Sequence, residues 1–221
     1  MQSPLVNSYL TEVGTAITSV SDRPDMPYSF RAVNACYVNA YTFPAGSMGL
    51  TRGILLELEN ESELAALLGH EVTHVAARHT AQRMTKGVLA TIAVAALTTY
   101  VAKEYEKYTQ LAAGLGGIGA GLLLARYSRD NEREADRVGL RYMNKASYAP
   151  AGMVGLMDIL VNLSKHSPNA IERMFMSHPM STERYNTARK LAQRKQTATA
   201  TSKVLRERYL DSIAPIRRQS D

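Results

Sequence analysis

Two histidines four residues apart, with a glutamate directly after the first, are the residues of this 221-residue chain best suited to chemistry. They are His70, Glu71 and His74, within LLGHEVTHVAARH (67–79). On an α-helix this spacing places both imidazoles on one face, where they can hold the same cation. Glu71 lies about 100° round the helix from His70, so its carboxylate can reach a water molecule at that cation without being a ligand.

This pattern has a small chance of arising by accident. Multiplying residue frequencies over the chain gives about 0.7% for one H-E-x-x-H. The alternative is a surface helix that happens to carry two histidines. Leu67, Leu68, Val72 and Val75 instead surround the motif with apolar residues, and a buried histidine pair needs a polar partner. His79 is about 180° from His70 on a continuous helix, so we expect it to face elsewhere.

Two histidines leave a zinc ion short of protein ligands, so a third must come from another segment. The best candidate segment is YSRDNEREADRVGL (127–140), where Glu132 and Asp136 are four residues apart on one helical face. One carboxylate can bind the metal while the other orients a ligand histidine through its free N–H. Glu134 is about 200° from Glu132, and we expect it in solvent. The alternative for Glu132 is an ordinary salt-bridged helix residue.

The elements that must position these residues are mostly helices. Apolar periodicity and capping residues predict helices over 4–20, 52–59, 61–84, 129–145, 151–164, 181–196 and 203–211, with strand structure over 28–43 and a possible return at 48–51. Two apolar runs, 87–102 and 111–125, predict a helical hairpin. Each run is shorter than the roughly 18–20 residues that span a bilayer. The hairpin is therefore either buried or a surface that docks on a membrane or a partner.

Composition excludes several classes of protein. A single cysteine, Cys36, rules out a disulfide framework and a thiolate zinc cluster. The net charge is +6, but ten Lys/Arg and only three Asp/Glu lie between Arg184 and Asp221. The rest of the chain is thus close to neutral, and without a nucleic-acid module we expect no nucleic-acid partner. The N-terminus, MQSPLVNSYL, has no signal-peptide pattern, which fits a cytoplasmic chain or one given without its leader.

Three motifs in order carry a resemblance to a known family. HEVTH, then YSRDNEREADRVG, then SHPMSTER (177–184) resemble metallopeptidase family forty-eight, the gluzincin family that includes HtpX, the CAAX prenyl endopeptidase and BepA. VNAYTFPAGSMGLTRGIL (38–55) also resembles the segment before the zinc helix of that family. The likeness covers about residues 30 to 190. It implies an α+β, mainly α, zincin-like fold with a small β-sheet before the zinc-binding helix.

The resemblance also implies roles for single residues. It implies one Zn²⁺ per chain, held by His70, His74 and Glu132, with Glu71 as general base and Asp136 supporting a ligand histidine. It further implies that two residues of the third motif, His178 and Arg184, lie near the active site. They would bind substrate or stabilise the oxyanion, and His178 could instead close the site as an extra ligand. The alternatives are a loop histidine and a surface arginine.

The function implied is that of a zinc metalloendopeptidase acting on unfolded or misassembled proteins. The family likeness places it in the bacterial cell envelope, in the periplasm, with the cytoplasm as the alternative. We expect a peptidase domain over 1–195, with the hairpin 87–125 inserted, and a basic tail over 196–221. The 38–52 segment could offer an open strand edge to an extended peptide. The competing functions are a latent or non-catalytic metal-containing scaffold, and a module that docks on membranes through 87–125. The sequence carries no signal for an oligomeric state.

Overall fold

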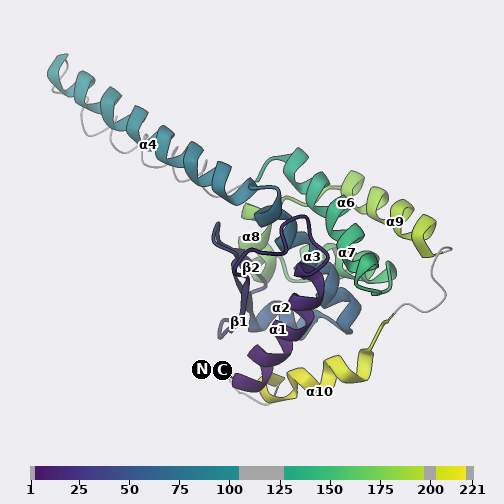
Figure 1. Ribbon diagram of the computed structural model, residues 1–221. Helices are drawn as coiled ribbons and strands as arrows, with labels where there is room; N and C mark the ends of the chain where they lie inside the picture. Colours follow the sequence, from purple (N-terminus) through teal and green to yellow (C-terminus); the bar gives the residue numbers. More distant parts are fainter. Residues whose placement is uncertain (1–2, 105–126, 197–202, 218–221) are drawn as a thin grey trace.

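The helix that carries the H-E-x-x-H motif, α3 (Glu61–Ala76), lies at the centre of the fold (Figure 1). The structure is a computed structural model that describes residues 3–104, 127–196 and 203–217. Around α3 stand the other described helices: α1 (Pro4–Thr18), α2 (Arg52–Glu57), α4 (His79–Glu104), α6 (Arg129–Lys145), α7 (Ala151–His166), α8 (Pro168–Ser177), α9 (Thr182–Gln196) and α10 (Arg206–Arg217). The fold is mainly helical, as the sequence predicts.

A small sheet precedes α3 in the chain and confirms the predicted fold class. It has three strands, β1 (Ser29–Val33), β2 (Ala40–Thr42) and β3 (Ser47–Thr51), in the order β1-β3-β2. β1 is parallel to β3 and β2 is antiparallel to it, so β2 forms an edge. The continuous strand predicted over 28–43 is interrupted at 34–39, where the backbone N–H of Val38 donates to the carbonyl oxygen of Ala170 in α8.

Two local features fix α3 where it lies. The side chain of Asn60 caps its N-terminus by accepting from the N–H of Glu63, and Glu61 places a negative charge in the first turn. Further along, Gly69 meets Gly139 of α6: a Cβ built on Gly69 would stand 2.8 Å from the carbonyl oxygen of Gly139. Only glycine allows the two backbones to approach this closely. The motif histidines of α3 are thereby brought against the acidic face of α6.

The sequence predicts one helix over 61–84, and this prediction is wrong at one point: the structure divides the range into α3 and the start of α4. The helix ends at Ala76, Arg78 takes a positive φ of 61°, and α4 starts at His79. From there α4 runs away from the rest of the molecule (Figure 1). The second arm of the predicted hairpin, 111–125, lies outside the described residues. Within the described ranges, no helix has the length and apolar character needed to cross a bilayer.

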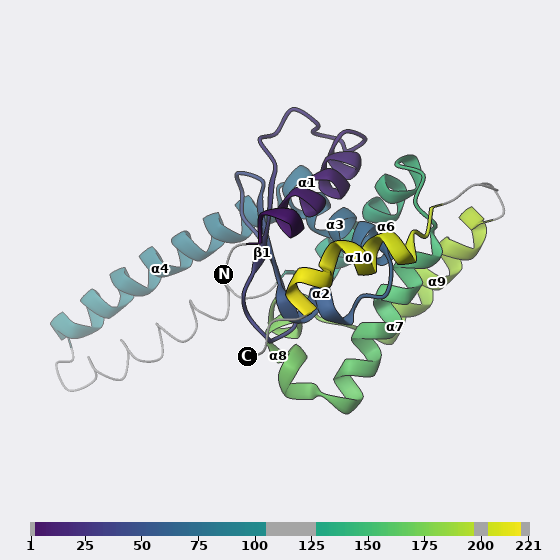
Figure 2. The same ribbon diagram turned by 90° about the horizontal axis from the view of Figure 1, so that it is seen from below.

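The basic C-terminal region contains a packed helix. In α10, Tyr209, Ile213 and Ile216 are buried in the main hydrophobic core, and the Tyr209 hydroxyl donates to the backbone carbonyl of Leu55 in α2. Figure 2 shows α10 lying across α1 and α2. The region predicted as a basic tail therefore includes an amphipathic helix whose apolar spacing of four and three residues is masked by its many charges.

Candidate metal centre

Three side chains from two helices converge at the middle of the fold. Nε2 of His70 and Nε2 of His74, both from α3, lie 3.1 Å apart. The Glu132 carboxylate of α6 reaches both rings, with Oε1 3.4 Å from His74 Nε2 and Oε2 3.6 Å from His70 Nε2. Zinc–ligand bonds of about 2.1 Å in a tetrahedron separate the ligand atoms by about 3.4 Å. The predicted ligand set therefore has the spacing that a single zinc ion requires.

His178, which follows α8, completes a buried group of four. Its Nδ1 lies 3.1 Å from Glu132 Oε1 and 3.4 Å from His70 Nε2. The ligand atoms of His70, His74, Glu132 and His178 all lie within 4.8 Å of one another. The other ring nitrogen of His178 is 3.6 Å from Glu71 Oε1. His178 thus stands at the fourth corner of the cluster, on the side of Glu71.

The two carboxylate oxygens of Glu71 differ: one accepts a hydrogen bond, and the other accepts none from the described residues. Its Oε2 accepts a hydrogen bond from the Thr42 hydroxyl at the end of β2. Its Oε1 has no hydrogen-bond partner among the described residues, although the side chain is 1% exposed. A buried carboxylate oxygen without a donor costs free energy unless a ligand or water supplies one. This unpaired oxygen beside two imidazoles and a second carboxylate fits a catalytic metal centre, since zinc prefers nitrogen and oxygen ligands.

Asp136 and Arg184 support the cluster from behind. The Asp136 carboxylate lies 2.9 Å from His70 Nδ1 and takes two hydrogen bonds of 2.7 Å from the Arg184 guanidinium. A third nitrogen of Arg184, Nη1, lies 2.7 Å from Glu132 Oε2. The guanidinium is buried: Nε and Nη2 donate to Asp136, and Nη1 donates to the backbone carbonyl of Pro179 while lying beside Glu132. This arrangement favours a positioning role for Arg184 over the predicted contact with substrate.

Two residues expected to face elsewhere also belong to the site. His79 is 4% exposed, and its Nδ1 lies 3.2 Å from His74 Nδ1. Its Nε2 lies 3.2 Å from Glu134 Oε2, on α6. The angular expectation for His79 was wrong because the helix breaks at residues 77–78 and the chain turns back towards His74. Glu134, which we expected in solvent, is partly exposed, and one of its carboxylate oxygens contacts His79.

His74, His79 and Glu134 form a chain of polar contacts. A metal ion on Nε2 of His74 would leave the hydrogen of that ring on Nδ1, which lies 3.2 Å from Nδ1 of His79. His79 would then carry its hydrogen on Nε2 and donate it to Glu134. Tyr127 covers the face of the His74 ring, with ring centroids 3.9 Å apart. Neither His79 nor Tyr127 was identified from the sequence, because no spacing rule connects them to His74.

Burial and charge set the protonation of the site. Burial holds the pKa of His74 well below its usual value, so the ring is neutral, as a metal ligand must be. Burial alone would lower the pKa of His70 too, but the Asp136 hydrogen bond and the Glu132 charge outweigh it and raise that pKa. Burial would raise the pKa of Glu132, whereas His178 and the other two rings hold it far below its usual value. The carboxylate is therefore ionised.

A cleft of about 510 Å³ opens beside this cluster. One wall is β2 with its two flanking residues, and His178 lies at the inner end of the wall formed by α8. The start of α4 and Tyr127 close the remaining side. Because no strand of the described residues lies on the outer side of β2, an extended chain in this cleft would run past the cluster along an open strand edge.

Comparisons with a protein-family model and with known proteins both match this chain to peptidases. The family model described as peptidase family M48 matches residues 4–192. Beta-barrel assembly-enhancing protease of Yersinia pestis is 29% identical over 210 residues, which cover 90% of this chain and 42% of that protein. Metalloprotease YcaL of Escherichia coli is 32% identical over 159 residues, covering 72% of this chain and 59% of YcaL.

The likeness extends beyond bacteria. Mitochondrial metalloendopeptidase OMA1 of Schizosaccharomyces pombe is 32% identical over 142 residues, which cover 64% of this chain and 40% of OMA1. This chain spans about two fifths of the length of the beta-barrel assembly-enhancing proteases that it matches. The residues matched by the family model, 4–192, include His70, His74, Glu132 and His178.

Proposed function

Because the chain belongs to peptidase family M48, we propose that it is a zinc-dependent endopeptidase that hydrolyses peptide bonds in unfolded or misassembled proteins. The observation that carries this proposal is the tetrahedral spacing of His70, His74 and Glu132 next to the unpaired oxygen of Glu71. One zinc ion per chain would be held by these three side chains. When bound, zinc supplies Lewis acidity to the scissile carbonyl and to the attacking water.

Glu71 acts as the general base in this proposal. Its free Oε1 accepts a proton from the attacking water, while Thr42 holds Oε2 and so fixes the plane of the carboxylate. The proton is then delivered by Glu71 to the leaving amine. His178, whose Nε2 is 3.6 Å from Glu71 Oε1, would donate to the developing oxyanion. Asp136 and Arg184 hold His70 and Glu132 in place.

The substrate binds as an extended segment along β2. Its backbone pairs with the open edge of Ala40–Thr42, which lines the cleft. Backbone pairing is largely independent of sequence, so it suits chains that expose extended segments because they are unfolded or wrongly assembled. A folded protein keeps such segments within its own sheets and helices, and it would be a poor substrate.

We assign the activity to the bacterial cell envelope, in the periplasm. Support comes from the names of the beta-barrel assembly-enhancing proteases, which describe work on barrel assembly. Fractionation of cells that produce the chain from its natural gene, with marker proteins for each compartment, tests this assignment. Recovery with the cytoplasmic marker would contradict it.

Hydrolysis is tested on unfolded casein. The proposal predicts fragments that disappear when a chelator is added and return when zinc is restored. The Glu71→Gln variant should keep zinc and lose turnover, because the amide cannot accept the proton. Undiminished turnover by Glu71→Gln would reject Glu71 as the base. Absence of casein cleavage by the zinc-loaded wild type would reject the peptidase activity.

His178 supports a second candidate, a latent state. Its Nδ1 is near enough to Glu132 and His70 to act as a fourth ligand, which would fill the position that a catalytic zinc keeps for water. In that state the protein would act as a metal-containing scaffold until His178 moves. The His178→Ala variant separates the two: faster casein cleavage than wild type supports latency, and slower cleavage supports an active role.

The exposed apolar residues of α4 support peripheral contact with a membrane through the 87–125 segment. Val88, Leu89 and Ile92 are between 56% and 60% exposed. Co-sedimentation with vesicles of anionic and neutral lipids measures this contact. Binding that is lost in a Val88→Ser, Leu89→Ser, Ile92→Ser variant supports it, and an absence of wild-type binding to either vesicle would refute it.

A further inference from the structure

The cleft beside the metal centre carries positive charge that the proposed chemistry does not use. Arg83 of α4 and Arg173 of α8 both line it, and none of the lining residues that the structure describes is Asp or Glu. Arg83 is close to the centre, since its guanidinium lies over Tyr127, which stacks on His74. Arg173 lies on α8, one helical turn before Met176 and five residues before His178, and all three line the cleft.

An aromatic ring orients each of these guanidinium groups. The guanidinium carbon of Arg173 is 4.4 Å from the ring centroid of Tyr37, and that of Arg83 is 4.2 Å from the ring centroid of Tyr127. The Tyr37 hydroxyl is in turn 2.8 Å from the Tyr41 hydroxyl in β2. A guanidinium that lies over a ring keeps the N–H donors of its edge available for a planar anion.

No Asp or Glu that the structure describes neutralises these two arginines. Among the residues that the structure describes, neither guanidinium lies within ion-pair distance of Asp or Glu. Arginines elsewhere in the molecule behave differently, and several are paired with carboxylates: Arg133, Arg141, Arg184 and Arg208. The cleft therefore offers two oriented cations to whatever binds in it.

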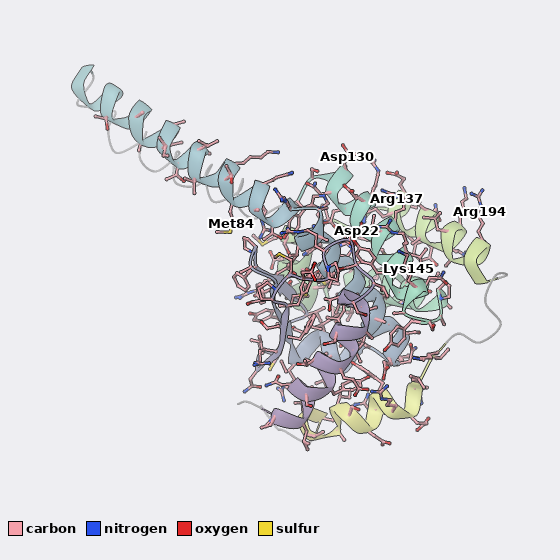
Figure 3. All side chains as sticks on the ribbon, in the orientation of Figure 1. Asp22, Met84, Asp130, Arg137, Lys145 and Arg194 are labelled. Atoms are coloured by element: carbon pink, nitrogen blue, oxygen red, sulfur yellow. The ribbon has the colours of Figure 1, made fainter. Side chains whose placement is uncertain are left out.

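Large apolar side chains accompany the charge. Phe43, Met84 and Met176 line the cleft and are 56%, 47% and 52% exposed. Figure 3 labels Met84 at the base of the projecting helix α4. Methionine adapts its shape to varied apolar partners, so these residues suit a bulky apolar side chain without fixing which one.

We propose that this cleft selects extended peptide segments that carry a carboxylate close to a bulky apolar side chain, with Arg83 and Arg173 as specificity-determining residues. This inference rests on the proposed peptidase function and adds a substrate class to it. The backbone of the segment pairs with β2, its apolar side chain contacts Phe43 and the two methionines, and its carboxylate meets the arginines. The carboxylate is supplied either by an internal Asp or Glu or by the chain terminus.

Matched fluorogenic peptides test the proposal. One apolar parent sequence is varied at each position in turn with Asp, Asn or Lys, and each peptide is prepared with a free or an amidated C-terminus. We expect the best Asp peptide to exceed its Asn counterpart about tenfold in kcat/KM, with a smaller difference at high salt. An advantage confined to internal Asp identifies a side-chain carboxylate, and one confined to free C-termini identifies the terminus.

Charge-reversed variants connect the preference to the two arginines. Arg173→Glu or Arg83→Glu should remove the Asp preference and favour the Lys peptide, while Arg173→Lys should retain part of it. Arg189→Glu on α9, an exposed position outside the cleft, is the charge-matched control and should keep it. Equal cleavage of Asp, Asn and Lys peptides by the wild type would overturn the proposal. So would a preference that survives in both charge-reversed variants.

A binding measurement keeps this test separate from that of the peptidase activity. Fluorescence anisotropy with the Glu71→Gln variant reports affinity without turnover, and we expect the Asp peptide to bind about tenfold more tightly than the Asn peptide. Equal affinities would overturn the specificity proposal even if casein is cleaved. Failure to cleave casein together with selective binding would reject the peptidase activity alone.

Discussion

Nδ1 of His74 and Nδ1 of His79 face each other at 3.2 Å, so the second motif histidine is oriented from behind by another histidine. His70 receives the same support from the Asp136 carboxylate at 2.9 Å. The two imidazoles are thus positioned by different chemistry, one by a neutral ring and the other by an ion-paired carboxylate. The His79 ring is in turn held by Glu134 of α6.

Removing the acceptor behind His74 should weaken metal binding. We predict that His79→Phe reduces zinc affinity by about 10- to 100-fold, because His74 loses the partner that fixes its tautomer and ring orientation. His79→Gln, which retains an acceptor oxygen, should recover part of the affinity. Competition with a chromogenic chelator measures it. Equal zinc affinity in His79→Phe and wild type would show that His79 only fills space.

Arg184 should contribute more to stability than a surface arginine does. It is 6% exposed and bridges Asp136 and Glu132, so Arg184→Met would leave two buried carboxylates without their cation. We predict a loss of about 3–5 kcal/mol in the free energy of unfolding at pH 7, measured by urea denaturation after chelation. Arg133→Met, an exposed position with its own ion pairs, is the control and should change little. Equal effects would contradict this account.

The cost of Arg184→Met should depend on pH. Burial would raise the pKa of Asp136, but Arg184 and His70 outweigh it and hold that pKa below its usual value. Near pH 4 the unfolded chain therefore binds more protons than the folded one. The stabilisation is complete above the unfolded pKa of about 3.9 and is lost as the pH falls through the lower folded value. The difference between wild type and variant should shrink from pH 6 to pH 3, and a constant difference would argue against this linkage.

Thr42 connects the edge strand to the proposed base. Thr42→Val preserves the shape of the side chain but removes the hydroxyl that donates to Glu71. We predict a fall in kcat of about tenfold, with zinc content unchanged, because the carboxylate loses its fixed plane. Thr42→Ser keeps the donor and should stay near wild type in steady-state peptide assays. A Thr42→Val enzyme with full kcat would remove Thr42 from the site.

The sequence predicted the parts of this molecule that depend on local periodicity. The helical spacing of His70 and His74, and of Glu132 and Asp136, placed each pair on one face. The resemblance to the M48 family identified both segments, and the family match confirms that resemblance. The convergence of the two helices depends on Gly69 and Gly139, whose contact no local pattern predicts.

The parts that were missed depend on where the backbone turns. His79 reaches His74 only because Arg78 takes a positive φ, and no glycine or proline marks that turn. The interruption of the strand at 34–39 depends on a hydrogen bond from Val38 to Ala170, 132 residues away. The packing of α10 was obscured by its charges, although Tyr209, Ile213 and Ile216 have helical spacing. Each feature depends on how distant parts of the chain pack together, and local sequence patterns do not predict such packing.

Zinc binding by the purified chain and by two single variants tests the central claim most directly. We predict one zinc ion per wild-type chain by elemental analysis, and almost none in His74→Ala or Glu132→Ala after dialysis against a weak chelator, with folding checked by circular dichroism. Folded Glu132→Ala protein that retains a full equivalent of zinc at wild-type affinity would contradict the claim that α3 and α6 share one metal ion.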